Sequence, residues 1–403
     1  MTSNVHTYTS ITANYLPKAR VLAESIKRVD PSVTFHLVLS DDLPSGFDLT
    51  QEPFDNVILA DDLPIENFRP WVFSHTVVEL CTAVKGLALE TIFDKYGADK
   101  VFYFDPDMAV FSRLDELSSL LDQHSTLLTP HQTEPESSVA AIMDNEMASL
   151  KYGVFNLGFV GVRNSPEGRR FSRWWADRLL QFCHDDHPRG LFTDQKWVNL
   201  APCFFEDIKV LRSPAFNVAT WNLTNRKATG TMADGVLIND EPLGFYHFSG
   251  FDSGAQEIML NKYGENSPAL YELRNWYIAE CERHGQSALG KLPSKFAHFD
   301  DGSVISKAHR LLYRERLDLQ KAFPDPFATA KGGYKEWFAN NASQTQDFRV
   351  LSVDANASFR DVVQDMSSFF HQTAYSGKAN SWPKRQMLRL MAGLLNFGVR
   401  LIK

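Results

Sequence analysis

The chain has 403 residues, of which 44% are hydrophobic and 22% are charged, and this composition is typical of a folded protein with a large core. The formal net charge is −8 at pH 7, and no tract rich in lysine and arginine occurs in the first two thirds. Because nucleic-acid binding depends on positive charge that neutralises phosphates, we expect no nucleic-acid partner.

The four cysteines are widely separated and form no Cys-x-x-Cys pair, so we expect neither a zinc site nor a disulfide framework, and a reducing compartment fits best. The stretch MTSNVHTYTSITANYL lacks the basic segment and apolar core of a secretory signal. No charge-free apolar stretch is long enough to span a bilayer. These features predict a cytoplasmic protein.

Short apolar runs rich in β-branched residues alternate with longer segments of helical periodicity over the first 255 residues. Strands are predicted at 5–11, 34–40, 56–60, 101–104, 125–130, 153–162, 235–238 and 243–248. Helices are predicted at 17–29, 76–97 and 166–183. This alternation indicates an α/β domain over residues 1–255, built on a mixed, mainly parallel sheet flanked by helices.

The strand signal fades after residue 255, and residues 256–403 are expected to form a mostly helical region. A helix is predicted at 268–285, a loop at 290–306 and an irregular connection rich in Pro, Gly and Asn at 323–345. A last helix covers 383–403, and we consider a role for this region in contacting the acceptor or a membrane.

The segment VFYFDPDMAVF places Asp105 and Asp107 directly after a predicted strand. In open α/β sheets, ligands bind beyond the carboxyl ends of the strands. Side chains two residues apart in an extended segment project to the same side, and Pro106 stiffens the backbone between them. Paired carboxylates repel unless a cation lies beside them, and Mg²⁺ or Mn²⁺ prefers such oxygen ligands. The alternative is an ordinary surface turn after a strand.

Five segments, in this order, resemble the motifs of GT-A-fold glycosyltransferases, and most closely those of the retaining enzymes of glycosyltransferase family 8. They are TSITANYLPKARVLAESI, VFYFDPDMAV, FNLGFVGV, FTDQKWVNL and HFSG, within residues 5–255. The resemblance implies a Rossmann-like GT-A fold. It also implies transfer of a sugar, with retention of configuration, from a nucleotide-diphosphate donor to a hydroxyl group of a glycan or lipid-linked acceptor of the bacterial envelope.

The resemblance also implies a metal site. Asp105 and Asp107 would bind Mn²⁺ or Mg²⁺, and His247, at the start of HFSG, would be the third protein ligand. Neutral imidazole is a competent ligand for such an ion. The alternative for His247 is a histidine at the edge of the core.

Three further residues would be catalytic by the same resemblance: Asn156 in FNLGF would face the donor sugar, and Asp194 and Gln195 in TDQKW would lie at its reacting face. As alternatives, Asn156 caps a strand end and Asp194 caps a helix. The residues expected to bind the donor, most simply a UDP-sugar, are Thr12, Asn14, Tyr15, Lys85, Asp105 and Asn222. The alternative for Lys85 is a structural lysine whose aliphatic chain packs along apolar neighbours.

Two departures from the family pattern bear on the donor. The acidic residues that usually precede Asn-Tyr are absent from TANY, which puts recognition of uracil in question. The lysine that usually follows His-x-x-Gly is also absent from HFSGFDSGAQ. Arg212, Arg226 and Lys227 are the sequence candidates for a replacement cation.

The C-terminal segment 382–403 contains basic residues and no acidic residue. A basic amphipathic helix of this kind either lies peripherally on the inner face of a membrane or packs on the protein with its basic face solvated. For the whole chain, the alternatives to a retaining transferase are an inverting transferase using Asp194 or Asp252 as base, a non-catalytic sugar-nucleotide-binding or glycan-binding subunit, and a metal-dependent phosphoesterase.

Overall fold

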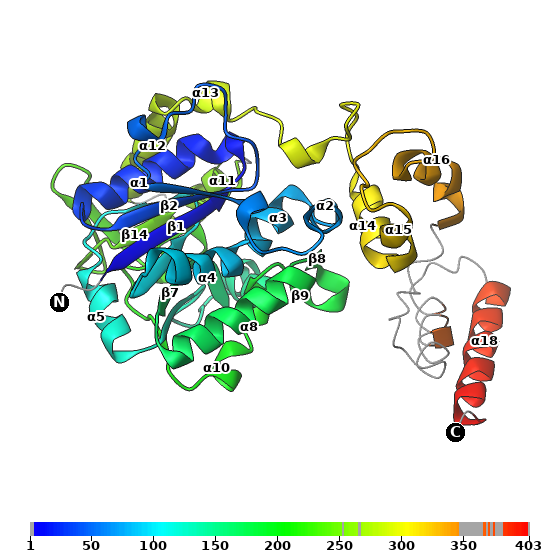
Figure 1. Ribbon diagram of the computed structural model, residues 1–403. Helices are drawn as coiled ribbons and strands as arrows, with labels where there is room; N and C mark the ends of the chain where they lie inside the picture. The colour runs from blue at the N-terminus through cyan, green and yellow to red at the C-terminus, as the bar shows by residue number, and fades with distance from the viewer. Residues whose placement is uncertain are drawn as a thin grey trace. The chain divides into compact units, whose positions relative to one another are not determined.

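The computed structural model describes residues 4–251, 254–264, 267–345, 366, 367, 370, 374 and 382–401. The chain forms two compact units (Figure 1). The first comprises Met1–Ile65 and Val77–Phe296, and the second comprises Glu66–Thr76 and Ala297–Lys403.

The first unit is built on a seven-stranded sheet with the order β10-β6-β7-β4-β1-β2-β3. Its strands are β1 (Val5–Ile11), β2 (Thr34–Leu39), β3 (Asn56–Leu59), β4 (Lys100–Phe104), β6 (Thr126–Pro130), β7 (Phe155–Arg163) and β10 (Ile208–Val210). Only β7 runs antiparallel to its neighbours, β4 and β6. The remaining neighbours pair in parallel. The predicted mixed, mainly parallel sheet is therefore confirmed.

Smaller sheets complete the first unit. A ribbon joins β5 (Met108–Val110) to β14 (Phe245–His247), and β8 (Asp185–Asp186) pairs with β9 (Leu191–Phe192). A three-stranded sheet contains β11 (Ala228–Thr231), β12 (Gly235–Ile238) and β13 (Glu241–Pro242). The β5–β14 ribbon begins directly after the Asp-x-Asp segment and ends at His247, so it brings these residues together.

Helices cover both faces of the main sheet, with α1 on one side and α4 and α8 on the other (Figure 1). The helices of this unit are α1 (Leu16–Val29), α3 (Val77–Ala83), α4 (Lys85–Tyr96), α5 (Asp115–Gln123), α6 (Val139–Ala141), α7 (Met147–Tyr152), α8 (Pro166–Phe182), α9 (Gln195–Val198), α10 (Ala201–Phe204), α11 (Ala255–Tyr263), α12 (Pro268–Arg283) and α13 (Gln286–Leu289). The helix predicted at 76–97 is divided at Val84 into α3 and α4.

Strand β4 is buried on both faces, which explains its apolar sequence. Phe102 and Phe104 pack with Leu22 and Ile26 of α1 in one core cluster. Tyr103 points to the opposite face, where the Lys85 ammonium lies 4.2 Å from the centre of its ring. The chain emerges from this double-sided core at Asp105, so the first carboxylate stands at the carboxyl edge of the sheet.

The first unit continues beyond the boundary that we expected at residue 255. Leu270, Leu273 and Tyr277 of α12 belong to a buried cluster with residues of β12 and β14. The rings of Phe248 and Tyr277 stack with centroids 3.9 Å apart. The apolar face of α12 is thus part of the core that supports the β5–β14 ribbon.

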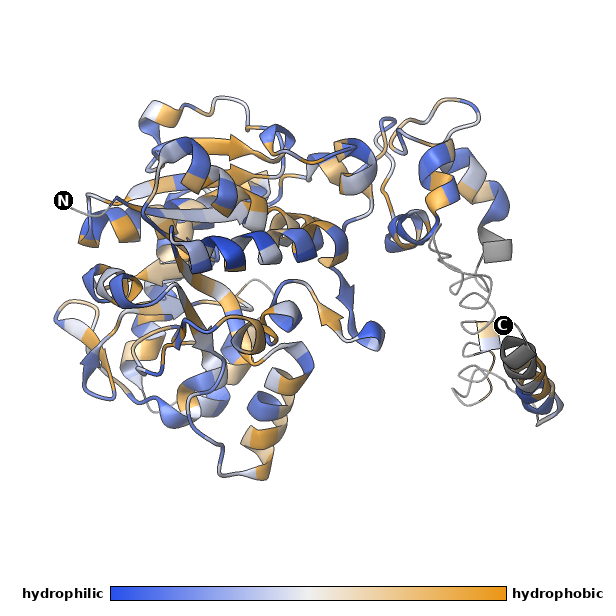
Figure 2. Ribbon diagram, turned by 60° about the horizontal axis from the view of Figure 1, so that its bottom comes forward, coloured by the Kyte–Doolittle hydropathy of each residue, from blue (hydrophilic) through white to orange (hydrophobic). Residues whose placement is uncertain are grey.

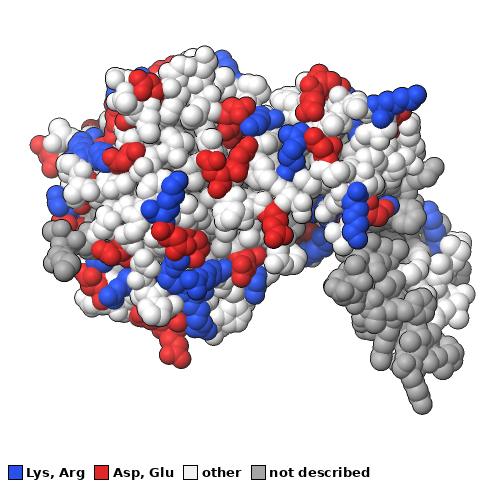
Figure 3. Space-filling model, in the orientation of Figure 1, with Lys and Arg blue, Asp and Glu red and all other residues white. Residues whose placement is uncertain are grey.

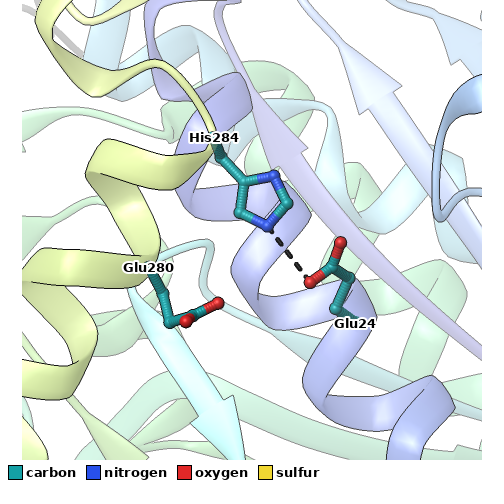
Figure 4. Close-up of side chains that lie close together, drawn as sticks. All are labelled: Glu24, Glu280 and His284. Atoms are coloured by element: carbon teal, nitrogen blue, oxygen red, sulfur yellow. Dashed lines mark ion pairs between the residues drawn. The ribbon is translucent and has the colours of Figure 1, made fainter.

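A cluster of charged residues joins α12 to α1. The ligand atoms of Glu24, Glu280 and His284 lie within 4.8 Å of one another (Figure 4). The Arg283 guanidinium contacts both carboxylates, and its Nε lies 3.0 Å from Glu280. Because Arg283 already supplies positive charge here, we interpret the cluster as an ion-pair network between the two helices.

The second unit is helical, as predicted for the C-terminal region. Its helices are α2 (Phe68–Phe73), α14 (Lys307–Glu315), α15 (Leu317–Ala322), α16 (Tyr334–Thr345) and α18 (Trp382–Leu401). The ring of Phe73 lies at its centre, 5.1 Å from Tyr313, 5.0 Å from Phe327 and 5.4 Å from Tyr334.

The irregular connection predicted at 323–345 was wrong in its second half, where α16 forms. Glycine and asparagine suggested a loop, but Tyr334, Trp337 and Phe338 recur at helical spacing. Tyr334 is fully buried, and its ring lies 5.1 Å from that of Tyr313. Tertiary packing of this aromatic face outweighs the weak local propensity.

Within the described ranges, no helix combines the length and apolarity needed to cross a membrane. Helix α18 carries hydrophobic and hydrophilic residues along its length (Figure 2). Its described part agrees with the helix predicted at 383–403, of which residues 402 and 403 lie outside the described residues.

Candidate functional site

Three neighbouring strands bring the motif residues to one edge of the sheet. Strands β4 and β1 are parallel, so Asp105 and Thr12 both follow carboxyl ends at that edge. Strand β7 is antiparallel to β4, so its beginning, with Asn156, lies beside the end of β4. The backbone N–H of Asp105 donates to the carbonyl of Gly158 over 2.7 Å, which fixes this junction.

The β5–β14 ribbon brings His247 to the two aspartates. In its register, His247 lies opposite Met108, and the N–H of Phe248 donates to the Asp107 carbonyl over 2.8 Å. The Nε2 atom of His247 is 3.1 Å from Oδ1 of Asp107 and 3.9 Å from Oδ2 of Asp105. Ligand atoms of Asp105, Asp107 and His247 thus lie within 4.8 Å of one another.

This group of residues fits a divalent cation. Two carboxylates and an imidazole suit Mn²⁺ or Mg²⁺, and they leave room for non-protein ligands. Burial by itself would raise the pKa of Asp107, but the charge and hydrogen bond of His247 and the charge of Lys18 lower it. Asp107 is therefore ionised at neutral pH, as a metal ligand must be.

His247 is oriented by Asn156. Oδ1 of Asn156 lies 3.3 Å from Nδ1 of His247 and also accepts from Nδ2 of Asn217 over 3.2 Å. A hydrogen bond at Nδ1 leaves Nε2 as the atom that faces the carboxylates. Asn156 therefore positions the histidine. The expectation that it faces the donor sugar stays a prediction.

Gly158 provides the space for this arrangement. A Cβ atom there would lie 2.7 Å from Cε1 of His247 and 2.8 Å from Oδ1 of Asn156. Real Cβ atoms do not approach other atoms so closely. The Asn-x-Gly pattern thus has a physical explanation. Asn156 orients the imidazole of His247, and the missing side chain of Gly158 leaves space for that ring.

Lys85 stands behind the aspartates as a buried counter-charge. Its Nζ lies 3.2 Å from Oδ1 of Asp105 and 3.1 Å from Oδ2 of Asp194. The Tyr103 hydroxyl donates to the same Asp105 oxygen over 2.6 Å. One oxygen of Asp105 is therefore engaged inside the protein, while the other, Oδ2, is the one nearer His247.

Asp194 and Gln195 lie in the inner wall of the site. Thr193 adopts a φ of 43°, which is rare for a β-branched residue and turns the chain so that Asp194 faces Lys85. Burial raises the pKa of Asp194, although Lys85 opposes the shift. Oε1 of Gln195 accepts from the Leu157 N–H over 3.1 Å and from Nδ2 of Asn156 over 3.2 Å.

The TANY segment forms a short 3₁₀ turn, Ala13–Tyr15, at the end of β1. The Thr12 hydroxyl donates to Oδ1 of Asn14 over 2.7 Å, so the two side chains expected to contact the nucleotide also bind each other. The N–H of Ala13 donates to Oδ2 of Asp41 over 3.3 Å. The carboxylate of Asp41, which follows β2, thereby reaches the segment that lacks acidic residues of its own.

Asn222 supports the site from a 3₁₀ segment, Thr220–Asn225. Its Oδ1 accepts from the Ala219 N–H over 3.0 Å, and its Nδ2 donates to the Asn217 carbonyl over 3.0 Å. These bonds are to backbone groups, and its proposed contact with the donor stays a prediction.

Arg212, Arg226 and Lys227, the sequence candidates to replace the absent lysine, do not lie together beside Asp105 and Asp107. The buried guanidinium of Arg226 donates to the Phe216 carbonyl over 2.7 Å, and burial lowers its pKa to about 10. Arg212 and Lys227 are exposed.

Sequence reasoning missed the buried cation Lys18. The available signal was its spacing, because Lys18, Leu22 and Ile26 follow one another at four-residue intervals on the core face of α1. Acidic and basic side chains are interspersed on the face in Figure 3. Lys18 and Lys85 are buried instead, at 2% and 5% exposure. A buried cation paired with carboxylates, as Lys85 is, marks a functional site better than surface charge does.

The chain matches no known family profile. It is 31% identical over 241 residues to the uncharacterized protein YfnD of Bacillus subtilis, which covers 58% of this chain and 73% of that protein. It is 24% identical over 255 residues to the uncharacterized protein YfnF of the same organism. That alignment covers 60% of this chain and 80% of YfnF. A structure of the galactosyltransferase LgtC in complex with donor and acceptor sugar analogues aligns with a TM-score of 0.42 at 13% identity, covering 72% of this chain and 97% of that one.

Substitution of Gly158 by alanine should weaken metal binding. The new methyl group would displace the His247 ring, and we expect Mn²⁺ affinity to fall by roughly 10- to 100-fold, as for other losses of ligand orientation. Gly161→Ala is a matched control in the same strand, since its Cβ would lie 2.9 Å from the Phe102 ring, away from the ligands. Both variants should melt earlier, but equal Mn²⁺ affinities by calorimetry would contradict the assigned role of Gly158.

Metal affinity should rise with pH. Burial by itself would lower the pKa of His247, but the charge and hydrogen bond of Asp107 raise it above its usual 6.5. The imidazolium–Asp107 pair therefore stabilises the metal-free protein fully below pH 6.5, and this stabilisation is lost as the pH rises through the raised pKa. A metal ion must displace that proton, so Mn²⁺ affinity should increase by about tenfold per pH unit below the pKa.

The measurement is Mn²⁺ titration of the wild type and of His247→Gln at a series of pH values around neutrality. The variant should bind more weakly and show a flatter pH dependence. A wild-type affinity that does not change with pH would contradict the assignment of His247 as a ligand.

Proposed function

The chain belongs to the same family as the uncharacterized protein YfnD of Bacillus subtilis, and we propose that it is a metal-dependent glycosyltransferase. It would move a sugar from a nucleotide-diphosphate donor to an acceptor hydroxyl group. The observation that carries this proposal is the group formed by Asp105, Asp107 and His247 at the carboxyl edge of a mainly parallel sheet.

The residues of the chain would hold Mn²⁺ or Mg²⁺ in a defined way. Asp107, Oδ2 of Asp105 and Nε2 of His247 are the proposed ligands. When bound, the cation supplies Lewis-acid stabilisation of the departing nucleoside diphosphate. Lys85 offsets the charge of Asp105 from behind, and Asn156 keeps Nε2 directed toward the carboxylates.

We further propose that the configuration is retained by attack of the acceptor on the face from which the diphosphate leaves. A covalent route needs an accessible nucleophile. Asp194 is 2% exposed and paired with Lys85, and an amide such as that of Gln195 is a poor nucleophile. Asp194 and Gln195 would then shape the wall beside the reacting sugar.

An inverting reaction needs a general base near the acceptor. Of the two sequence candidates, Asp194 is held by Lys85, and Asp252 lies outside the described residues. The favoured donor is a UDP-sugar. The proposed acceptor is a glycan or lipid-linked saccharide of the bacterial envelope, reached from the cytoplasmic side.

The decisive experiment is a screen of nucleotide sugars for thermal stabilisation and hydrolysis with Mn²⁺, Mg²⁺ or a chelator. A ligand at about 100 times its Kd should stabilise the wild type by about 2.7 kcal/mol, and only when metal is present. Asp107→Asn should lose this effect while remaining folded. Asp177→Asn, an exposed residue of α8, is the control and should behave as wild type.

Stabilisation by no nucleotide sugar would overturn the proposal. Binding without turnover against a panel of acceptors would favour a non-catalytic binding subunit. NMR of the product anomer separates retention from inversion, and release of phosphate from simple esters would indicate a phosphoesterase.

A peripheral membrane contact through residues 382–403 is proposed from the surface of α18. One side of this helix is packed, where the buried Ser367 hydroxyl donates to the Ala392 carbonyl over 2.9 Å. Met387, Leu390 and Leu394 are 56%, 65% and 62% exposed and recur at helical spacing. Exposed apolar side chains next to basic residues suit the surface of an anionic bilayer.

Replacing Met387, Leu390 and Leu394 together by serine should reduce co-sedimentation with vesicles that contain anionic phospholipid. The expected loss is at least about tenfold, because full burial of even one of these large apolar side chains contributes about 1.5–3 kcal/mol. Replacing the exposed Ile258 of α11 by serine is the control. Equal sedimentation of all three proteins would refute membrane contact by this face.

A further inference from the structure

Trp221 lies directly beside the candidate metal site. Its indole meets the imidazole of His247 edge-on, with the ring centroids 5.2 Å apart and the planes at 82°. The indole also meets the ring of His131, with the centroids 5.6 Å apart. His131 in turn lies against Asn156, whose Nδ2 is 3.3 Å from its Nε2. Trp221 therefore contacts a proposed metal ligand and a neighbour of the residue that orients that ligand.

Hydrogen bonds fix the segment that carries Trp221. The His247 N–H donates to the Val218 carbonyl over 2.8 Å, which joins this segment to β14. The side chain of Asn222 bonds two backbone groups of the same segment. The Gln132 side chain donates to the Trp221 carbonyl over 2.5 Å. The position of the indole is thus set by the backbone around it as well as by its ring contacts.

The indole keeps binding capacity that the protein does not use. Trp221 is half-buried, so part of its ring surface is open to a ligand. Its buried N–H has no acceptor anywhere in the described part of the chain. A buried indole N–H usually has a hydrogen-bond partner. An oxygen atom of a bound ligand would supply that partner.

These properties select the chemistry of the ligand. A phosphate group is bound best by cationic donors, whereas an indole offers an apolar surface and one neutral N–H. A pyranose ring matches both features, because it has C–H groups on its faces and hydroxyl oxygens at its edge. Trp221 therefore suits a sugar better than it suits the diphosphate.

We propose that Trp221 is a binding residue of the sugar subsite, where a pyranose ring packs on the indole beside His247. This inference rests on the proposed function and deepens it. The diphosphate would lie at the metal, and the sugar joined to it would begin next to His247. The donor and acceptor sugars meet at the transferred carbon atom, so the test has one arm for each sugar.

The donor arm compares a nucleotide sugar with its own nucleoside diphosphate, each with Mn²⁺. UDP-glucose and UDP are the first pair, followed by the glucose forms of CDP, dTDP, GDP and ADP. Trp221→Leu should bind the nucleotide sugar roughly tenfold more weakly, because a large apolar contact is lost. Trp221→Phe keeps a ring and should lose roughly 2- to 10-fold, the range for one neutral hydrogen bond. Affinities for the nucleoside diphosphate and for Mn²⁺ alone should not change.

The acceptor arm uses the methyl glycosides of glucose, galactose and mannose with UDP and Mn²⁺ present. Saturation-transfer NMR reports which glycosides the wild type binds. A loss of roughly tenfold in Trp221→Leu in this arm alone would assign the indole to the acceptor sugar. A loss in the donor arm alone would assign it to the donor sugar.

Trp174→Leu is the matched control. Trp174 is a half-buried tryptophan of α8 that also has two edge-on aromatic neighbours, Phe204 and Phe205. Its loss should leave all the affinities unchanged. Thermal unfolding without ligand reports whether each variant is intact, and Trp221→Phe carries the test if Trp221→Leu does not fold.

The outcomes separate this inference from the proposed function. If the wild type binds a nucleotide sugar and neither arm changes in the Trp221 variants, the inference is overturned and the function stands. A parallel loss of Mn²⁺ affinity would show that Trp221 only supports the His247 ring, which also overturns the inference. If the wild type binds neither a nucleotide sugar nor a nucleoside diphosphate with Mn²⁺, both proposals fail.

Discussion

The arrangement of the site depends on keeping two carboxylates, Asp105 and Asp107, close together at the end of a buried strand. Like charges at this separation repel, and burial makes the repulsion stronger. Lys85 and Tyr103 hold one oxygen of Asp105, while His247 contacts Asp107. The other oxygen of Asp105, Oδ2, lies on the side of the imidazole. A divalent cation bound between the imidazole and the two aspartates would neutralise their carboxylates.

The fold supplies these partners from distant parts of the chain. Antiparallel β7 places Asn156 and Gly158 beside the end of β4. The β5–β14 ribbon places His247 opposite Met108, the residue after Asp107. Asn156 then fixes the imidazole, and the missing side chain of Gly158 makes room for it. Metal binding, diphosphate binding and sugar positioning would therefore share one rigid support, which suits a reaction that relies on preorganised electrostatics.

Helix α1 belongs to the same support. Its first turn carries Lys18 beside Tyr15, and Leu22 and Ile26 on its core face share one buried cluster with Phe102 and Phe104 of β4. The buried side of α1 thus contributes to the core from which Asp105 emerges.

The sequence by itself determined six of the seven strands of the main sheet, the helices α1, α4, α8, α12 and α18 and the Asp-x-Asp edge, because period-two and helical hydrophobic patterns report burial directly. It also pointed to His247 and Asn156 through their motifs. Only the tertiary structure decided that Asn156 orients His247, that Lys85 bridges Asp105 and Asp194, and that α16 is a helix. These features depend on contacts between residues far apart in the chain, which local patterns do not encode. Lys18 shows the limit most clearly, since its spacing placed it on the core face but only the fold brought its ammonium to 5.9 Å from the centre of the Phe251 ring.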